Sequence, residues 1–258
     1  MDSRRPSLPA NAIPHFKLGL LLCDHVPDEL APCFQDYPEM FTKAFTRGNA
    51  NIKWQIFDIT KEELPTSANI CDGYLISGSR HSANDNERWI GSLMLFSKEV
   101  HEAKIPIVGL CFGLQILAKA LRGKVEKARQ GWGIGHKQYR VTTHETNLLL
   151  KADSKITVPV CHQDQITRIP DGSIRIASNE HCQNFIVFFG NHTLGIQGHP
   201  EFEDRYLNAL IEYKKNELTD EEYLVAKQSR PRPEDSKILR QVILDFLFRV
   251  TKFYSKET

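Results

Sequence analysis

Cys111 lies in a sequence pattern that suits a nucleophile. The apolar run 105–110 precedes it, and Gly113 and an apolar pattern with helical spacing follow it. We therefore expect a strand, a sharp turn that carries Cys111, and a helix. Such a turn exposes a side chain at a helix N-terminus, where the partial positive charge favours a thiolate over a thiol. Gly109 and Gly113 flank the cysteine at positions where a side chain would crowd the turn.

His199 and Glu201 could complete the chemistry of this cysteine. A nucleophilic cysteine needs a base, and the base needs a group that orients it. His199 follows a short strand-like run, Glu201 comes two residues later, and Pro200 between them restricts the backbone. We expect Glu201 to bind one imidazole nitrogen while the other nitrogen faces Cys111. The long separation along the chain is no obstacle, because such partners meet in the folded protein.

Three motifs resemble those of class I glutamine amidotransferases. Residues 109–115 (GLCFGLQ) resemble the family's nucleophile elbow, and residues 198–201 (GHPE) resemble its His-Pro-Glu motif. Residues 76–81 (ISGSRH) resemble the loop that supplies a backbone N–H to the oxyanion hole. The motifs occur in the family's order, and the resemblance covers roughly residues 16 to 205.

The resemblance implies roles for five residues. Cys111, His199 and Glu201 would form a catalytic triad. The backbone N–H groups of Gly78 and Phe112 would form the oxyanion hole, in which two preorganised donors stabilise a developing negative charge.

Five further polar residues are candidate substrate contacts. Gln115, Ser79 and Arg80 belong to these motifs, whereas His162 and Asp164 belong to an expected loop at residues 160–165 (VCHQDQ), which resembles a family segment near the substrate. Alternatives stay open for most of them. Gln115 could line the substrate pocket or cap the elbow, Arg80 and Asp164 could belong to solvated loops, and His162 could stabilise its own loop. Residues 131–135 (GWGIG) match a family loop near the glutamine site, although a turn between strands would need the same glycines.

The loop at residues 77–81 (SGSRH) departs from the Ser-Gly-Gly-Pro that is usual in the family. This variant looks more like stand-alone γ-glutamyl peptidases and GMP synthase-like amidotransferase-domain proteins. It favours cysteine-dependent hydrolysis of a γ-glutamyl amide, in a small molecule or a peptide, through a γ-glutamyl thioester. One alternative is a glutaminase subunit that delivers ammonia to a separate synthase, since no P-loop or adenylating motif is found. Another is a non-catalytic ligand-binding or redox/chaperone-type protein of the same superfamily.

Composition narrows the class of protein. The 258 residues include 33 Lys and Arg against 32 Asp and Glu, with no long run of one sign. We therefore expect neither a nucleic-acid partner nor a membrane surface. The six cysteines are irregularly spaced and no secretory signal precedes them, which indicates reduced thiols and a cytoplasmic protein. The histidines show no metal-ligand spacing, so we expect no metal and no cofactor.

Strand and helix patterns alternate in the first half of the chain. Strands are expected at 17–23, 52–57, 73–77 and 105–110, and helices at 36–48 and 86–103. This alternation predicts an α/β three-layer sandwich with a mainly parallel central sheet. The resemblance implies the flavodoxin-like fold of class I glutamine amidotransferases, with its nucleophile elbow at the carboxyl ends of the strands.

The second half of the chain has a different pattern of predicted elements. Short strand-like runs at 137–141, 155–160, 174–178, 185–189 and 193–197 predict antiparallel strands added to the same sheet. Helices are expected at 203–216, 219–228 and 236–253. We expect a flexible leader at residues 1–15 and one domain at 16–258. Its helical C-terminal extension, residues 203–258, carries no motif for chemistry, and we expect it to pack on the sheet or on a partner.

Overall fold

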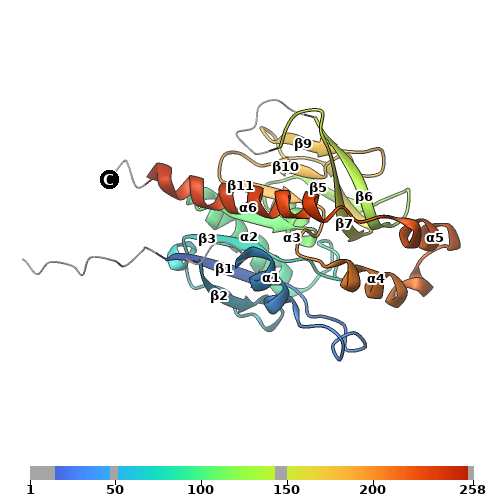
Figure 1. Cartoon of the computed structure of the whole chain (residues 1–258). Coiled ribbons are helices and arrows are strands. Elements are labelled where there is room, and N and C mark those ends of the chain that lie inside the picture. Colours follow the sequence, from blue (N-terminus) through green and yellow to red (C-terminus); the bar gives the residue numbers. More distant parts are fainter. Residues whose placement is uncertain (1–14, 47–51, 143–149, 255–258) are drawn as a thin grey trace, which may run out of the picture.

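The computed structural model describes residues 15–46, 52–142 and 150–254, with side chains up to residue 248. Their strands form one nine-stranded sheet and a separate two-stranded sheet. Figure 1 shows the large sheet with helices on both of its faces. Residues 1–14 of the expected leader lie outside the described residues.

The first part of the large sheet is parallel. Its strands, in spatial order, are β2 (Ile52–Asp58), β1 (Phe16–Leu22), β3 (Gly73–Ile76), β4 (Ile107–Leu110) and β11 (Thr193–Ile196). Each strand is parallel to its neighbour. The carboxyl ends of β3, β4 and β11 therefore meet at one edge, because Ile76 pairs with Gly109 and Ile196 pairs with Leu110.

Antiparallel strands extend the sheet beyond β11, as the sequence predicts. They are β10 (Ile186–Phe188), β9 (Ile174–Ser178), β6 (Gly133–Val141) and β7 (Lys155–His162). The separate sheet pairs β5 (Lys124–Lys127) with β8 (Asp164–Arg168), and sequence patterns missed both of these strands. Residues 160–165, taken from the sequence as a loop, are the end of β7, a single connecting residue and the start of β8.

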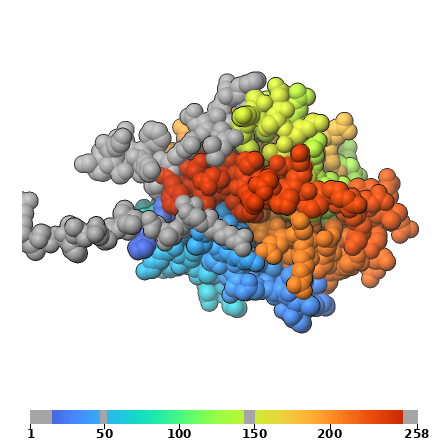
Figure 2. All heavy atoms as spheres, viewed as in Figure 1, coloured from blue at the N-terminus to red at the C-terminus, as the bar shows by residue number. Residues whose placement is uncertain are grey.

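The helices make the outer two layers of the sandwich. On one face, α1 (Tyr37–Thr46) and α6 (Pro233–Tyr254) pack against the sheet through residues such as Phe41, Phe45 and Leu239. On the other face, α2 (Arg88–Glu102) and α3 (Phe112–Ala120) pack through Leu93 and Leu117 among others. Figure 2 shows α6 crossing its face as a continuous ridge. The predicted fold class is confirmed.

The C-terminal region is helical, as the sequence predicts. It contains α4 (Asp204–Tyr213), a short 3-10 turn (Lys215–Glu217), α5 (Asp220–Gln228) and α6. The last helix begins three residues earlier than expected, with Pro233 at its first position, where a missing N–H costs no hydrogen bond. In the part of the chain that the structure describes, no helix combines the length and hydropathy needed to cross a bilayer.

Candidate active site

Cys111 occupies the sharp turn between β4 and α3, as predicted. Its φ of 52° and ψ of −104° are unfavourable for a residue that has a side chain. The Cys111 N–H donates a 2.8 Å hydrogen bond to the carbonyl of Ile196, which holds the turn against β11. A Cβ at Gly109 would collide with the backbone of Gly113, so the turn requires glycine there.

His199 and Glu201 lie close to this turn and bind each other. They follow β11, which runs parallel to β4, so they reach the same edge of the sheet as Cys111. His199 Nδ1 lies 2.7 Å from Glu201 Oε1, and both side chains are almost fully buried. The ring of Phe202 stacks on the imidazole with the ring centroids 4.1 Å apart. The pair and the stacked ring together fix the orientation of the imidazole.

His199 and Cys111 meet around Gly78, which follows β3. A Cβ placed on Gly78 would lie 2.7 Å from His199 Cε1 and 3.6 Å from Cys111 Cβ. Phe112 is the first residue of α3, and the first N–H groups of a helix have no acceptor within that helix. The two backbone donors expected from the sequence therefore belong to residues that adjoin the thiol.

The charges around His199 favour its protonated form. Burial alone would lower the pKa of this histidine, because an imidazolium loses hydration inside the protein. The charge interactions and hydrogen bonds of His199 with Cys111 and Glu201 outweigh burial and raise the pKa to about 10. An imidazolium in this place can stabilise a thiolate and can also supply a proton.

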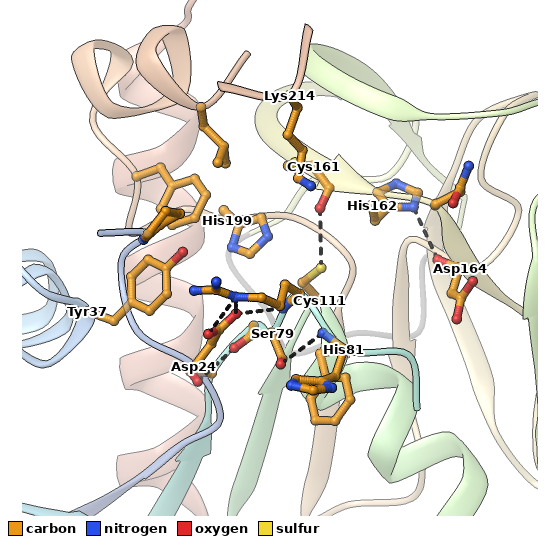
Figure 3. Close-up of a pocket in the computed structure, with 18 of the residues that line it drawn as sticks. Asp24, Tyr37, Ser79, His81, Cys111, Cys161, His162, Asp164, His199 and Lys214 are labelled. Carbon is orange, nitrogen blue, oxygen red and sulfur yellow. Dashed lines mark hydrogen bonds and ion pairs between the residues drawn. The ribbon is translucent and has the colours of Figure 1, made fainter. Parts of the chain in front are cut away.

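Two groups that the sequence gave no reason to select contact the sulfur of Cys111. The Cys111 thiol donates to the carbonyl oxygen of Cys161 at 3.8 Å, as Figure 3 shows. The side-chain amide of Gln197 donates to the same sulfur at 3.5 Å. Gln197 is completely buried and lies two residues before His199, so its position in the strand-like run offered the only signal.

A cavity of about 410 Å³ opens in front of Cys111. All ten of the residues singled out from the sequence line it or adjoin it, and nearby charged and aromatic side chains enclose it (Figure 3). Its volume falls within the range of small-molecule pockets.

Gln115 and Asp164 tie two walls of this cavity together. The Gln115 side-chain amide donates to the carbonyl oxygen of Asp164 at 2.9 Å and to the side-chain oxygen of Gln197 at 3.3 Å. The carboxylate of Asp164 accepts a short hydrogen bond from the hydroxyl of Ser82. Both residues line the cavity. The Gln115 side chain joins α3 to the start of β8, and the Asp164 side chain joins β8 to Ser82 in the loop after β3.

Arg80 and Ser79 are held within the loop that follows β3. Arg80 Nε lies 3.0 Å from both carboxylate oxygens of Asp24, and Arg80 Nη2 donates to the carbonyl of His25 at 2.8 Å. The hydroxyl of Ser79 accepts from the N–H of His81 at 3.2 Å. Arg80 is therefore a cation in the cavity wall that is tethered to Asp24, and about half of its side chain (49%) is exposed.

His162 is buried and neutral. Its ring packs against Gly133, where a Cβ would lie 2.5 Å from His162 Nε2. Burial, with a smaller effect from the neighbouring His181, lowers the pKa of His162 to about 3. Its Nδ1 lies 3.3 Å from the carbonyl oxygen of Asp164, so the ring also supports the strand end that lines the cavity.

The outer wall of the cavity comes from the C-terminal helices. Tyr213, Lys214 and Glu217 line it, together with Trp132 from the segment before β6. The expectation that residues 203–258 serve packing alone is therefore too narrow. Their contribution to the cavity wall could not be predicted, because the sequence does not show which of its many lysines lies near the motifs.

No group of three or more His, Cys, Asp or Glu side chains suited to hold a metal ion occurs among residues 15–46, 52–142 and 150–254. The polar groups that line the cavity include thiols, imidazoles, hydroxyls, amides and paired ions. These groups can carry out nucleophilic attack and proton transfer.

The chain is similar to named proteins over most of its length. It is 30% identical over 221 residues to γ-glutamyl peptidase 2 of Arabidopsis thaliana, covering 82% of this chain and 87% of that protein. It is 26% identical over 235 residues to γ-glutamyl peptidase 3 of the same plant, covering 88% and 93%. It is 31% identical over 179 residues to the glutamine-hydrolyzing GMP synthase of Wigglesworthia glossinidia brevipalpis, covering 64% of this chain and 33% of that protein.

Solved structures and a family match agree on the fold. A glutamine amidotransferase from Thermotoga maritima superposes with a TM-score of 0.71 at 21% identity, covering 92% of this chain and 98% of that one. The family described as Glutamine amidotransferase class-I matches residues 33–213, which is more than half of the sequence. The chain therefore belongs to the glutamine amidotransferase class-I family.

Proposed function

We propose that this protein hydrolyses γ-glutamyl amide bonds as a stand-alone γ-glutamyl hydrolase or peptidase. The observation that carries the proposal is the buried 2.7 Å pair of His199 and Glu201 next to Cys111 at the carboxyl ends of the parallel strands. A thiol, a base and a group that orients the base are the parts that nucleophilic acyl transfer needs. The names of the Arabidopsis relatives add the γ-glutamyl group.

The first half-reaction forms a thioester. The Cys111 thiolate attacks the γ-carbonyl carbon of the substrate, and the carbonyl oxygen becomes an oxyanion. The N–H groups of Gly78 and Phe112 stabilise that oxyanion. His199 Nε2 then gives its proton to the leaving nitrogen, the C–N bond breaks, and a γ-glutamyl thioester and a free amine result.

The second half-reaction releases glutamate. His199, now neutral, takes a proton from a water molecule that attacks the thioester carbon. The carbon–sulfur bond breaks, the thiolate of Cys111 is regenerated, and glutamate leaves. Glu201 stabilises the imidazolium at both stages and transfers no proton itself. The cycle uses side chains of the protein and water, with no metal and no cofactor.

The glutamyl group would lie against the wall that Gln115 and Asp164 form. Both residues line the cavity on the side of α3 and β8 and are fixed by hydrogen bonds. Ser79 and the buried His162 would complete this wall. His162 would do so by shape, because its lowered pKa keeps it uncharged.

A second candidate function is a glutaminase subunit that passes ammonia to a separate synthase. The similarity to GMP synthase favours it, because this chain matches only 33% of that longer protein. The chemistry at Cys111 would be the same in both cases. The two functions differ in the group that leaves when the thioester forms, which is ammonia for the glutaminase subunit and an amino acid, peptide or other amine for the hydrolase.

The experiment is an assay of glutamate release from glutamine and from glutathione, with Cys111→Ala as the blank. Hydrolysis of glutathione by the purified protein, and much slower hydrolysis of glutamine, would support the peptidase. Release of glutamate from glutamine alone would support the glutaminase subunit. If the wild-type protein releases no glutamate from either substrate, alone or with cell extract, the proposed function is wrong.

A further inference from the structure

The turn that carries His199 and Glu201 separates two cavities. Glu201 and Phe202 line the cavity in front of Cys111, and they also line a second cavity of about 670 Å³. Cys111 and His199 line only the first cavity, whereas Arg240 of α6 lines only the second. Arg240 therefore approaches the turn from a side that the thiol does not face, and any effect of this residue on catalysis must act through the turn.

The guanidinium of Arg240 binds the middle of this turn. Its Nη1 donates a hydrogen bond to the carbonyl oxygen of Pro200 at 2.6 Å, and a charged donor makes a stronger hydrogen bond than a neutral one. Pro200 lies directly between His199 and Glu201 and has no N–H. Its carbonyl is therefore the only polar backbone group that it offers, and a residue of the last helix binds it.

The direction of the Pro200 carbonyl follows the one soft rotation between His199 and Glu201. The peptide bonds on both sides of Pro200 are planar, the ring locks its φ, and the residue before a proline has a restricted ψ. Rotation about ψ of Pro200 remains, and it moves Glu201 relative to His199. The turn's own hydrogen bond, from the Phe202 N–H to the His199 carbonyl at 3.1 Å, does not include the Pro200 carbonyl. The bond from Arg240 does include it and so limits this rotation.

The Glu201 carboxylate depends on this placement of its backbone. Its Oε1 lies 2.7 Å from His199 Nδ1, while its Oε2 is buried and has no hydrogen-bond partner in the part of the chain that the structure describes. No second hydrogen bond therefore holds the carboxylate in line with the imidazole. Phe202, whose ring stacks on the imidazole, is the next residue of the chain and would move together with Glu201.

Arg240 extends from a helix that is fixed to the same framework as the turn. In the first turn of α6, Asp235 accepts a 2.8 Å hydrogen bond from the N–H of Thr157 on β7. Two residues along that strand, the carbonyl of Pro159 accepts a 2.8 Å hydrogen bond from the N–H of His199. Helix, strand and turn are thus joined to one another, and Arg240 supplies the contact from the helix to the turn.

We propose that Arg240 is a positioning residue of the candidate triad. By holding the Pro200 carbonyl, it keeps the Glu201 carboxylate in line with His199 Nδ1, so that the imidazole faces the thiol. This inference rests on the proposed hydrolysis of γ-glutamyl amides. It gives α6 a role in catalysis, although that helix lies outside residues 33–213, which the family matches.

Four variants test the positioning role. Arg240→Met removes the donor and keeps the aliphatic stem, and Arg240→Gln is a second variant without the charge. Arg240→Lys keeps a charged donor. Lys237→Met is the matched control, because Lys237 lies one turn earlier on α6, lines the same cavity and pairs with the exposed Glu234 at 2.6 Å instead of with the turn. Each variant is assayed well below its melting temperature, which circular dichroism measures.

Hydrolysis of γ-glutamyl-p-nitroanilide as a function of pH is the first measurement. In Arg240→Met, a displacement of part of an ångström should lower kcat by about tenfold and leave KM unchanged, because no contact with substrate is lost. Glu201 helps to raise the pKa of His199, so the alkaline limb of the profile should move to lower pH. Arg240→Gln should behave in the same way, Arg240→Lys should recover most of the activity, and Lys237→Met should match the wild type.

A purely structural role would give a different result. A loss of stability alone lowers the melting temperature and moves neither kcat nor the alkaline limb. If Arg240→Met and Arg240→Gln change only the melting temperature, or raise KM at constant kcat, the positioning role is wrong while the hydrolysis stands.

A double-mutant cycle tests whether Arg240 acts through Glu201. In the Glu201→Gln protein the carboxylate that Arg240 would position is already absent. Adding Arg240→Met to that protein should therefore cost much less than the loss of about tenfold expected in the wild-type background. Equal losses in the two backgrounds would show that Arg240 acts elsewhere and would overturn the proposal.

Alkylation of Cys111 separates this inference from the proposed function. If the wild-type protein releases no p-nitroaniline, the proposed hydrolysis fails. The rate at which iodoacetamide modifies Cys111 near neutral pH still reports the thiolate, and mass spectrometry distinguishes this cysteine from the others. An imidazolium that Glu201 holds less firmly stabilises the thiolate less, so Arg240→Met should slow the modification and Lys237→Met should not. Equal rates in the wild type and in Arg240→Met would overturn the positioning role.

Discussion

Glu222 on α5 binds the backbone of Trp132 in the cavity wall. Its Oε1 accepts a hydrogen bond from the Trp132 N–H at 2.7 Å. Its Oε2 accepts one from the N–H of Thr219 at 2.8 Å and completes the capping box of α5. The preceding Gly131 has a φ of 79°, and a Cβ there would collide with Glu222. A single carboxylate therefore joins a C-terminal helix to the wall of the candidate active site.

Replacing Glu222 with alanine should affect both stability and substrate binding. Loss of the cap and of the Trp132 hydrogen bond should lower the free energy of unfolding by about 1–2 kcal/mol. Because Trp132 would lose its anchor, KM for a γ-glutamyl peptide should rise more than kcat falls. Denaturant unfolding and steady-state kinetics measure the two effects. Glu221→Ala, at the exposed neighbouring position in the first turn of α5, is the control: it should leave KM unchanged and lower stability by no more than about 0.3–1 kcal/mol. Equal effects of the two variants would contradict the coupling.

The sequence was sufficient for the elbow because the relevant signals are local. A β-branched run, Cys111 and two close glycines determine the strand, the turn and the helix without reference to the rest of the chain. The parallel order of the strands then explains why the separate motifs at Gly78 and His199 reach the same edge. Cys111, Gly78 and His199 therefore lie together in the folded protein, although each motif alone is short.

The rest of the site could not be predicted from the sequence because it depends on contacts between distant segments. Lys214 and Trp132 have no pattern that distinguishes them from other lysines and aromatic residues, and only the fold places one over the other. Gln197 looks like one more residue of a buried strand until the structure places its amide 3.5 Å from Cys111. The pair β5 and β8 was missed because both strands are short and carry mixed polarity.

Replacing Gly78 with alanine should reduce turnover sharply while the protein still folds. The added Cβ would lie 2.7 Å from His199 Cε1, so the imidazole must shift away from the thiol. A displacement of about 1 Å in a reacting group can reduce the rate by about 100-fold, and we expect at least this loss in kcat/KM. Gly91→Ala on α2 is the control, because a Cβ there meets nothing within 4 Å. The control should keep full activity and gain about 0.5–1 kcal/mol of stability. A fully active Gly78→Ala protein would contradict the proposed geometry.

His25 should stabilise the fold at low pH more than at high pH. It lies 2.6 Å from Asp36 and 3.0 Å from Asp58. Burial alone would lower the pKa of His25, but the hydrogen bonds to these two carboxylates outweigh burial and raise it. A raised pKa adds stability that is fully present below the unfolded value of about 6.5 and is lost as pH rises through the folded value.

The measurement is the free energy of unfolding of the wild type and of His25→Gln, from below the unfolded pKa of about 6.5 to above the raised folded pKa of His25. The difference between the two proteins should shrink as pH rises. His101→Gln is the control with the opposite sign, because burial lowers the pKa of His101 and its neutral form binds Thr193 at 2.7 Å. For His101 the difference should grow as pH rises. Parallel trends in the two variants would contradict the assignment.

The alkaline limit of activity should move when Glu201 is replaced by glutamine. His199 must be protonated to release the amine, and its raised pKa keeps it protonated well above the range of an ordinary histidine. Glu201→Gln removes one of the two negative charges that raise this pKa, so the alkaline limb of kcat/KM should shift to lower pH. The variant should keep partial activity, because Glu201 orients the ring and transfers no proton.

The pH profile of kcat/KM for γ-glutamyl-p-nitroanilide, from about pH 6 to about pH 11, measures this shift. Glu203→Gln is the matched control: its side chain is 66% exposed and pairs with Lys43 at 2.7 Å, outside the triad. Its profile should overlay that of the wild type. If the Glu201→Gln profile also overlays the wild type in position and height, Glu201 does not act on His199 and the triad assignment is wrong. A shift confined to Glu201→Gln requires that the buried 2.7 Å pair controls the proton of His199.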